Sequence, residues 1–153
     1  MGAFGAFFRG FAYAGRGLAR CMRERNFRFH LCAAGFTAYF AARFYELSRA
    51  EWAVLLLTFA AVISLEAVNT AIECLCDKVS PEKDPLIMRA KDCAAGAVLI
   101  AAVFSVGVAV ALFWDIERIG AIVSYFTAEW YRIPLLLAAL LAAMCAVFLP
   151  KKK

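Results

Sequence analysis

Charged side chains are scarce in this sequence. Asp, Glu, Lys and Arg make up only 19% of the 153 residues, against about 25% in typical soluble domains, while 65% of the residues are hydrophobic. A domain of this size folded in water would leave far too much apolar surface exposed. The composition therefore excludes an ordinary soluble domain and predicts a single all-α integral membrane domain over residues 1–153.

Several familiar binding motifs are also missing. No Gly-x-x-x-x-Gly-Lys-Ser/Thr loop is present, and Gly15-Arg16-Gly17 lacks the third glycine of a dinucleotide fingerprint. The six cysteines have neither the paired spacing of a zinc site nor that of a secreted disulfide scaffold, so we expect small buried thiols. The net charge of +5 is spread unevenly, which in a membrane protein indicates orientation, and no nucleic-acid partner is expected.

Helical periodicity and apolar runs predict the organisation of the chain. At the N-terminus, Phe4, Phe8 and Phe11 recur on one helical stripe while arginines gather on another, which predicts an amphipathic helix lying on the membrane surface. The strongest span is 93–114, with 22 uncharged residues. The predicted segments are a surface helix over 1–28, transmembrane helices over 29–45, 52–76, 91–114 and 133–149, a loop over 77–90, an external connection over 115–132 and a basic tail over 150–153.

The distribution of lysine and arginine predicts the orientation. Segment 1–28 holds six basic residues, segment 77–92 four and the tail three, whereas the two alternate connections hold two each. Cytoplasmic loops carry the excess of such residues. Four spans with both termini in the cytoplasm satisfy this rule at every loop.

The most unusual residues lie in the second predicted span. Glu66, Asn69, Glu73 and Asp77 are spaced i, i+3, i+7 and i+11, so a helix places them on one stripe. The stripe could simply hydrogen-bond to neighbouring helices and hold the bundle together. Three acids so close would repel one another, however, and a divalent metal such as Mg²⁺, which prefers oxygen ligands, resolves that repulsion.

Lys91 and Asp92 open the third predicted span on the same side of the membrane. Taken alone, Lys91 could be an interfacial anchor. Beside an acidic metal site, it becomes a candidate for holding nucleotide phosphates, which would then bind through charge and metal rather than through a glycine-rich loop.

Two blocks of sequence resemble a known family. Residues 66–73 (Glu-Ala-Val-Asn-Thr-Ala-Ile-Glu), followed by Asp77, resemble the signature of the small prokaryotic diacylglycerol kinases and undecaprenol kinases, and residues 89–98 resemble the second block of that family. Residues 14–17 and 24–30 are more similar to the Gram-positive, undecaprenol-using branch. The resemblance covers about residues 4–114.

The resemblance implies an ATP-dependent lipid kinase of the bacterial cytoplasmic membrane that makes undecaprenyl phosphate from undecaprenol, with diacylglycerol as the alternative substrate. Glu66 would be the general base, and Asn69 would orient it or the lipid hydroxyl. Glu24 and Glu73 would carry Mg²⁺. The nucleotide would meet Glu24, Glu73, Lys91 and Asp92, with help from Tyr13 and from the loop residues Glu82, Lys83 and Asp84. The family implies a homotrimer whose active sites are shared between subunits.

Two features differ from the family pattern. Asp84 stands where part of the family has a histidine, and the fourth predicted span is extra. The residues alone leave two other functions open. A small ion channel or transporter would use the acidic stripe as an ion path, and a structural scaffold would have no turnover.

Overall fold

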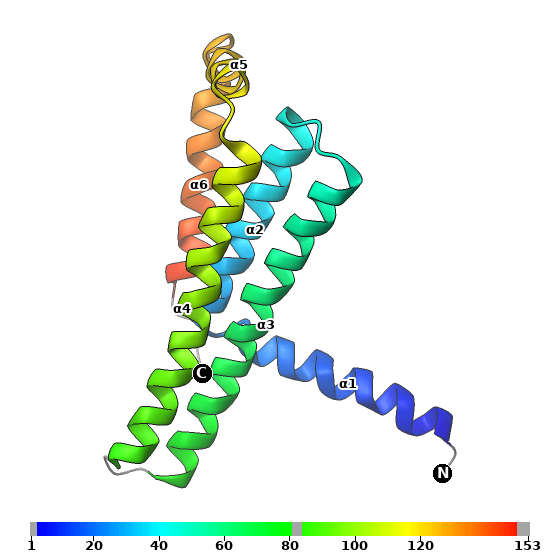
Figure 1. Cartoon of the computed structure of the whole chain (residues 1–153), viewed down its shortest axis with the longest axis vertical. Helices are drawn as coiled ribbons and strands as arrows, with labels where there is room; N and C mark the ends of the chain where they lie inside the picture. The colour runs from blue at the N-terminus through cyan, green and yellow to red at the C-terminus, as the bar shows by residue number, and fades with distance from the viewer. Residues whose placement is uncertain (1–2, 81–83, 150–153) are drawn as a thin grey trace.

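A computed structural model describes residues 3–80 and 84–149, all of whose regular elements are α-helices. This agrees with the predicted all-α class. The helices are α1 (Ala3–Cys21), α2 (Arg25–Phe44), α3 (Arg49–Val79), α4 (Pro85–Phe113), α5 (Ile116–Thr127) and α6 (Arg132–Phe148). Helices α2, α3, α4 and α6 form an elongated bundle, α1 projects sideways from it, and α5 lies across its top end (Figure 1).

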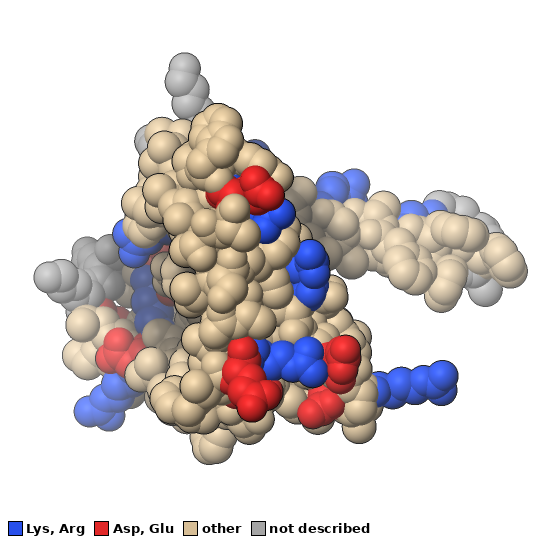
Figure 2. Space-filling model, turned by 90° about the horizontal axis from the view of Figure 1, so that it is seen from above, with Lys and Arg blue, Asp and Glu red and all other residues tan. Residues whose placement is uncertain are grey.

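Helix α1 has the character of a surface helix. Its arginines are its only charged residues, and its large apolar side chains Phe4, Phe8, Phe11 and Leu18 are all exposed. The view from above shows basic but no acidic side chains on the visible part of α1 (Figure 2). An exposed apolar face beside a basic one fits a helix lying in the headgroup layer.

The boundary between α1 and α2 differs from the prediction, which ran the surface helix through residue 28. The helix ends at Cys21, and α2 begins at Arg25, with Glu24 as its N-cap residue. No glycine or proline interrupts the sequence here. Instead Arg28, only 5% exposed, donates hydrogen bonds to the carbonyl oxygens of Met22 (3.2 Å) and Arg23 (2.6 Å), which the break leaves without helical partners.

Helices α3 and α4 form a long hairpin with the most extensive helix packing in the described structure. Ser48 and Glu51 form a capping box at the start of α3. At the start of α4, the Asp84 carboxylate accepts a hydrogen bond from the Leu86 N–H, and Pro85 occupies the first turn. Helix α3 continues to Val79 and α4 begins at Pro85, so both helices extend into the segment predicted as a loop over 77–90.

The hairpin is longer than a membrane is thick. At 1.5 Å per residue, the 31 residues of α3 span about 46 Å and the 29 residues of α4 about 44 Å. A hydrocarbon core of about 30 Å takes up roughly 20 residues of each. If the other end of the hairpin lies at the opposite interface, about ten residues per helix project from the membrane, and Figure 1 shows the hairpin continuing past the level at which α1 leaves the bundle. We call these residues, 70–80 and 84–93, the overhang.

Two of the described helices, α3 and α4, are long and apolar enough to cross a membrane on their own. Helices α5 and α6 meet the same criterion together, although they are bent by 102° at their junction. Helix α2 has arginines near both ends and α6 has only 17 residues, so neither qualifies alone. That α2 and α6 each cross the membrane therefore stays a prediction.

The C-terminal helices are attached to α2 at both ends. The second guanidinium nitrogen of Arg28 donates to the carbonyl oxygens of Val147 (2.6 Å) and Leu149 (3.4 Å), at the end of α6. At the opposite end, Arg118 of α5 donates to the Phe44 carbonyl oxygen (3.1 Å) and lies 3.3 Å from the Glu46 carboxylate. The segment predicted as an external connection over 115–132 therefore contains a helix that is tied to the end of α2.

Candidate functional site

The acidic stripe of α3 opens onto a polar cavity of about 300 Å³, which we call the acidic cavity. One wall is the stripe itself, and the other is the junction of α1 and α2. Its lining residues are Glu24, Arg25, Asn26, Glu66, Asn69, Thr70 and Glu73. The chain thus brings four of the predicted site residues, Glu24, Glu66, Asn69 and Glu73, to one cavity. Glu24 reaches it because the helix breaks at residues 22–24, a feature with no signal in the local sequence.

Glu66 is the most deeply placed acid of the cavity. Glu66 is only 4% exposed, and its Oε1 atom lies 3.2 Å from the Nε2 atom of His30 on α2. A carboxylate in such a place needs a polar partner, and His30 is that partner. The sequence analysis gave His30 no role at the site. The available signal was that His30 is the one histidine of the chain and lies in an apolar stretch, where a histidine needs a polar partner.

Asn69 connects the acids of the stripe. Its Nδ2 atom donates a 2.9 Å hydrogen bond to Oε1 of Glu73, one helical turn further on. Its Oδ1 atom is buried and accepts no hydrogen bond from the described residues. Buried carbonyl oxygens are normally satisfied, so this one is oriented as an acceptor for a group that the chain itself does not supply.

These oxygen atoms suit a magnesium ion. Among the described residues, no group of three or more His, Cys, Asp or Glu side chains is arranged to hold a metal. Mg²⁺ does not require one, because it usually binds through one or two carboxylates and fills its octahedron with water and substrate phosphates. Glu24 and Glu73 line the acidic cavity, and together with the unpaired oxygen of Asn69 they would provide such a partial set of ligands.

Lys91 and Asp77 face each other across the overhang. The Lys91 ammonium group donates a hydrogen bond to the Asp77 carboxylate; the Asp77 side chain is exposed, and that of Lys91 is half-buried. Asp92 follows Lys91 on α4 and is also exposed. These residues do not line the acidic cavity, and they lie further along the hairpin, where α3 and α4 have left the predicted hydrocarbon core.

Tyr13 and Asp84 lie apart from the cavity in the single chain. Tyr13 is exposed on α1, with the Arg16 guanidinium carbon 4.7 Å from its ring centre. Asp84 caps α4 through its hydrogen bond to Leu86, which gives this residue a structural task where part of the family has histidine. Glu82 and Lys83 lie outside the described residues.

Comparison with known proteins identifies the sequence pattern. Residues 12–113 match the family described as prokaryotic diacylglycerol kinase. The chain is 42% identical over 108 residues to an undecaprenol kinase of Bacillus subtilis, which covers 70% of this chain and 87% of that relative. It is also 42% identical over 98 residues to a diacylglycerol kinase of Synechocystis, which covers 63% of this chain and 55% of that relative. No solved structure matches the chain.

Proposed function

Since the chain belongs to the prokaryotic diacylglycerol kinase family, a family of membrane lipid kinases that use ATP as phosphoryl donor, we propose that it phosphorylates undecaprenol to undecaprenyl phosphate. The similarity to the undecaprenol kinase of Bacillus subtilis, which extends over 87% of that relative, supports the preference for undecaprenol. Diacylglycerol is the alternative substrate, supported by the Synechocystis relative. The observation that carries the proposal is the single cavity lined by Glu24, Glu66, Asn69 and Glu73.

Glu66 is the general base in this proposal. It lies where the stripe passes from the hydrocarbon into the overhang, so a lipid alcohol that diffuses within the membrane reaches it without leaving lipid. One carboxylate oxygen faces His30, and we assign the other to the lipid hydroxyl. His30 then holds the carboxylate in place while Glu66 takes the hydroxyl proton, which makes the lipid oxygen a better nucleophile toward the γ-phosphate.

Glu24, Glu73 and the Oδ1 atom of Asn69 would hold Mg²⁺, and we assign the nucleotide to the same side of the protein. Bound Mg²⁺ would supply positive charge to offset the phosphate oxygens during transfer. The half-buried Lys91 side chain supplies a second positive charge from the overhang, on the side where a nucleotide arrives from water. Asp92 completes the nucleotide contacts on α4.

In this proposal, Tyr13 and Asp84 complete the nucleotide site only in an assembly, and Glu82 and Lys83 stay predicted nucleotide contacts outside the described residues. In the single chain, Tyr13 and Asp84 are separate from the acidic cavity. We therefore retain the homotrimer, in which a neighbouring subunit would contribute such residues. The many large apolar side chains on the surfaces of α3 and α4 leave area for both lipid and neighbouring helices.

The orientation follows from charge and from the direction of the overhang. Segments 1–28 and 77–92 and the C-terminal tail together carry 13 of the 17 lysines and arginines, and such an excess is typical of the cytoplasmic side. We therefore propose the bacterial cytoplasmic membrane, with the acidic cavity facing the cytoplasm, where ATP is found.

A panel of lipid alcohols tests the proposal. The purified protein in bilayers is given ATP and Mg²⁺ with undecaprenol, a shorter polyprenol or diacylglycerol at equal mole fraction, and transfer of labelled phosphate to lipid is measured. We expect the highest kcat/KM with undecaprenol. Higher kcat/KM with diacylglycerol would reverse the substrate assignment, and no transfer to any of these alcohols would refute the proposed activity.

A further inference from the structure

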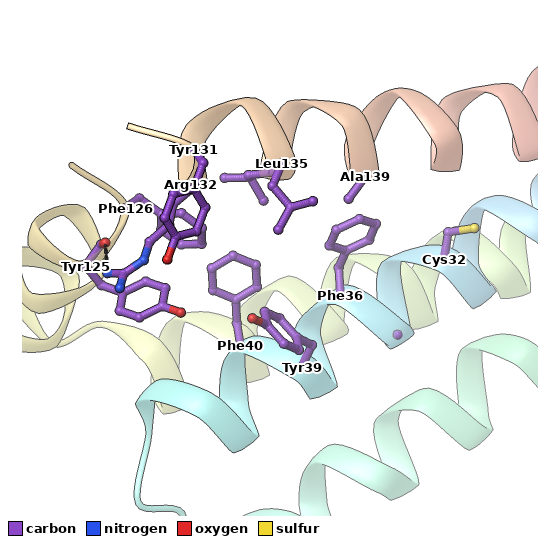
Figure 3. A pocket seen from close by; sticks show the side chains of 12 residues that line it. Cys32, Phe36, Tyr39, Phe40, Tyr125, Phe126, Tyr131, Arg132, Leu135 and Ala139 are labelled. Atoms are coloured by element: carbon purple, nitrogen blue, oxygen red, sulfur yellow. Dashed lines mark hydrogen bonds between the residues drawn. The ribbon is translucent and has the colours of Figure 1, made fainter. Parts of the chain in front are cut away.

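A cavity larger than the acidic cavity lies elsewhere in the described structure. It has a volume of about 520 Å³ and lies between α2 on one side and α5 and α6 on the other; we call it the aromatic groove (Figure 3). Its volume is within the roughly 300–1,000 Å³ range of ligand-binding pockets. Helices α5 and α6 follow the last residue matched to the family, residue 113, so the groove exists only because of this C-terminal addition.

The polarity of the groove changes along its length. At one end, Tyr125, Tyr131 and Arg132 surround its mouth, where α5 meets α6. From there the groove follows α2 and α6 past Phe36 to Cys32 and Ala139, which are small and uncharged (Figure 3). A polar mouth near the α5 end and an apolar interior toward the middle of the bundle match a molecule with one polar end and a hydrocarbon chain.

The mouth is positively charged. The guanidinium carbon of Arg132 lies 4.2 Å from the ring centre of Tyr125, and that of Arg43 lies 4.8 Å from the same centre. Arg132 also donates a 2.7 Å hydrogen bond to the Tyr125 carbonyl oxygen. Within residues 3–80 and 84–149, no carboxylate forms an ion pair with either arginine. Two cations thus remain without an anionic partner beside an apolar groove.

We propose that the aromatic groove binds one anionic phospholipid, with an acyl chain between α2 and α6 and the phosphate beside Arg132 at the mouth. Arg43 does not line the groove, but it contacts the same Tyr125 ring and adds a second positive charge near the mouth. Arginine forms several hydrogen bonds with a phosphate in a fixed geometry. The lipid chain would cover the aromatic and aliphatic surfaces that line the groove.

This site is separate from the acidic cavity. It faces residues 32–40 of α2, whereas the acidic cavity involves residues 24–26 at the other end of that helix. The proposal therefore does not depend on the lipid that is phosphorylated.

Native mass spectrometry of the purified protein tests the proposal. The protein is exchanged into detergent containing equal amounts of phosphatidylglycerol and phosphatidylcholine with the same acyl chains, and the lipid retained per chain is counted. We expect about a fivefold preference for phosphatidylglycerol, because the choline cation of phosphatidylcholine offsets its phosphate and one exposed ion pair contributes up to about 1 kcal/mol. The double substitution Arg43→Gln with Arg132→Gln should bring the ratio close to one.

A second variant tests the location of the bound chain. A Cβ atom added at Gly35, which lines the groove, meets no other atom within 4 Å, so Gly35→Leu fills the groove without a backbone clash. Gly107→Leu is the matched control, because Gly107 on α4 has the same free space but does not line the groove. We expect Gly35→Leu to abolish lipid retention and Gly107→Leu to retain it, with kinase activity kept in both as the check on folding.

Three outcomes would overturn the proposal. The first is equal retention of the two phospholipids by the unsubstituted protein. The second is unchanged retention in Gly35→Leu, which would place the bound lipid elsewhere. The third is loss of the oligomer in Gly35→Leu with lipid retention unchanged, which would make the groove an interface between two copies of the chain.

Discussion

The substitution Glu66→Gln tests the proposed general base most directly. Gln has nearly the same volume as Glu and keeps a polar group facing His30, so a residue that is only 4% exposed can be replaced without leaving a void. The substitution removes the proton acceptor alone. General-base catalysis typically contributes about 10²- to 10⁴-fold, so kcat should fall by that factor, which corresponds to about 3–5 kcal/mol in activation free energy.

The assay measures transfer of labelled phosphate from ATP to the lipid at saturating lipid, with ATP varied. The KM for ATP should change less than about threefold, because the assigned nucleotide contacts lie on other residues. Glu117→Gln, an exposed glutamate on α5, is the matched control and should keep wild-type kcat. A kcat in the Glu66→Gln protein within threefold of the wild-type value, in a correctly assembled sample, would refute the role of Glu66.

A double-mutant cycle separates the contribution of His30 from that of Glu66. His30→Ala alone should lower kcat, since it removes the group 3.2 Å from the Glu66 carboxylate. In the Glu66→Gln background, the same change should cost almost nothing further, because two residues that act as a unit are not additive. Equal losses in both backgrounds would show that His30 acts independently of Glu66.

Four further predictions concern other parts of the structure. Glu73→Ala should raise the Mg²⁺ concentration for half-maximal activity at least about tenfold, the lower end of what weakening a metal site costs; an unchanged magnesium response would exclude Glu73 as a ligand. Lys91→Met should raise the KM for ATP with a smaller effect on kcat, and Asp77→Asn should raise this KM less. Equal KM values in the wild-type protein and both variants would contradict the role of Lys91 in holding phosphate. Arg28→Ala should destabilise the protein by about 1.5–3 kcal/mol in denaturant unfolding, the range for hydrogen bonds from charged groups, because it leaves buried carbonyl oxygens unpaired; a smaller change would mean that water replaces the guanidinium. Because burial raises the pKa of the Cys21 thiol, less reactive thiolate is present at pH 8, so alkylation of Cys21 followed by mass spectrometry should be slower in the folded than in the unfolded protein; equal rates would contradict its burial.

The spacing of the acidic stripe was the most informative feature of the sequence. Because a helix repeats every 3.6 residues, Glu66, Asn69 and Glu73 had to share a face once the segment was predicted to be helical, and all three line the acidic cavity. The resemblance of residues 24–30 to the family added Glu24, although nothing in the local sequence explained how that residue would reach α3.

The features that the sequence analysis did not predict depend on contacts between distant segments. The helix break before Glu24 is held by Arg28, which also joins the end of α6 more than 100 residues later. The helix propensity of a segment depends on neighbouring residues and cannot reveal such a distant contact. Likewise, His30 became a site residue only when α2 packed against α3, and the aromatic groove required both α5 and α6 to fold back onto α2.

The overhang of α3 and α4 also explains how so short a chain accommodates two immiscible reactants. A highly charged phosphoryl donor needs a polar surface in contact with water, whereas a hydrophobic acceptor needs a surface within the membrane. Roughly three extra turns on each of two membrane helices supply such a polar surface. Shortening the hairpin tip by a few turns should leave the membrane-embedded part of the bundle intact while removing the proposed nucleotide contacts.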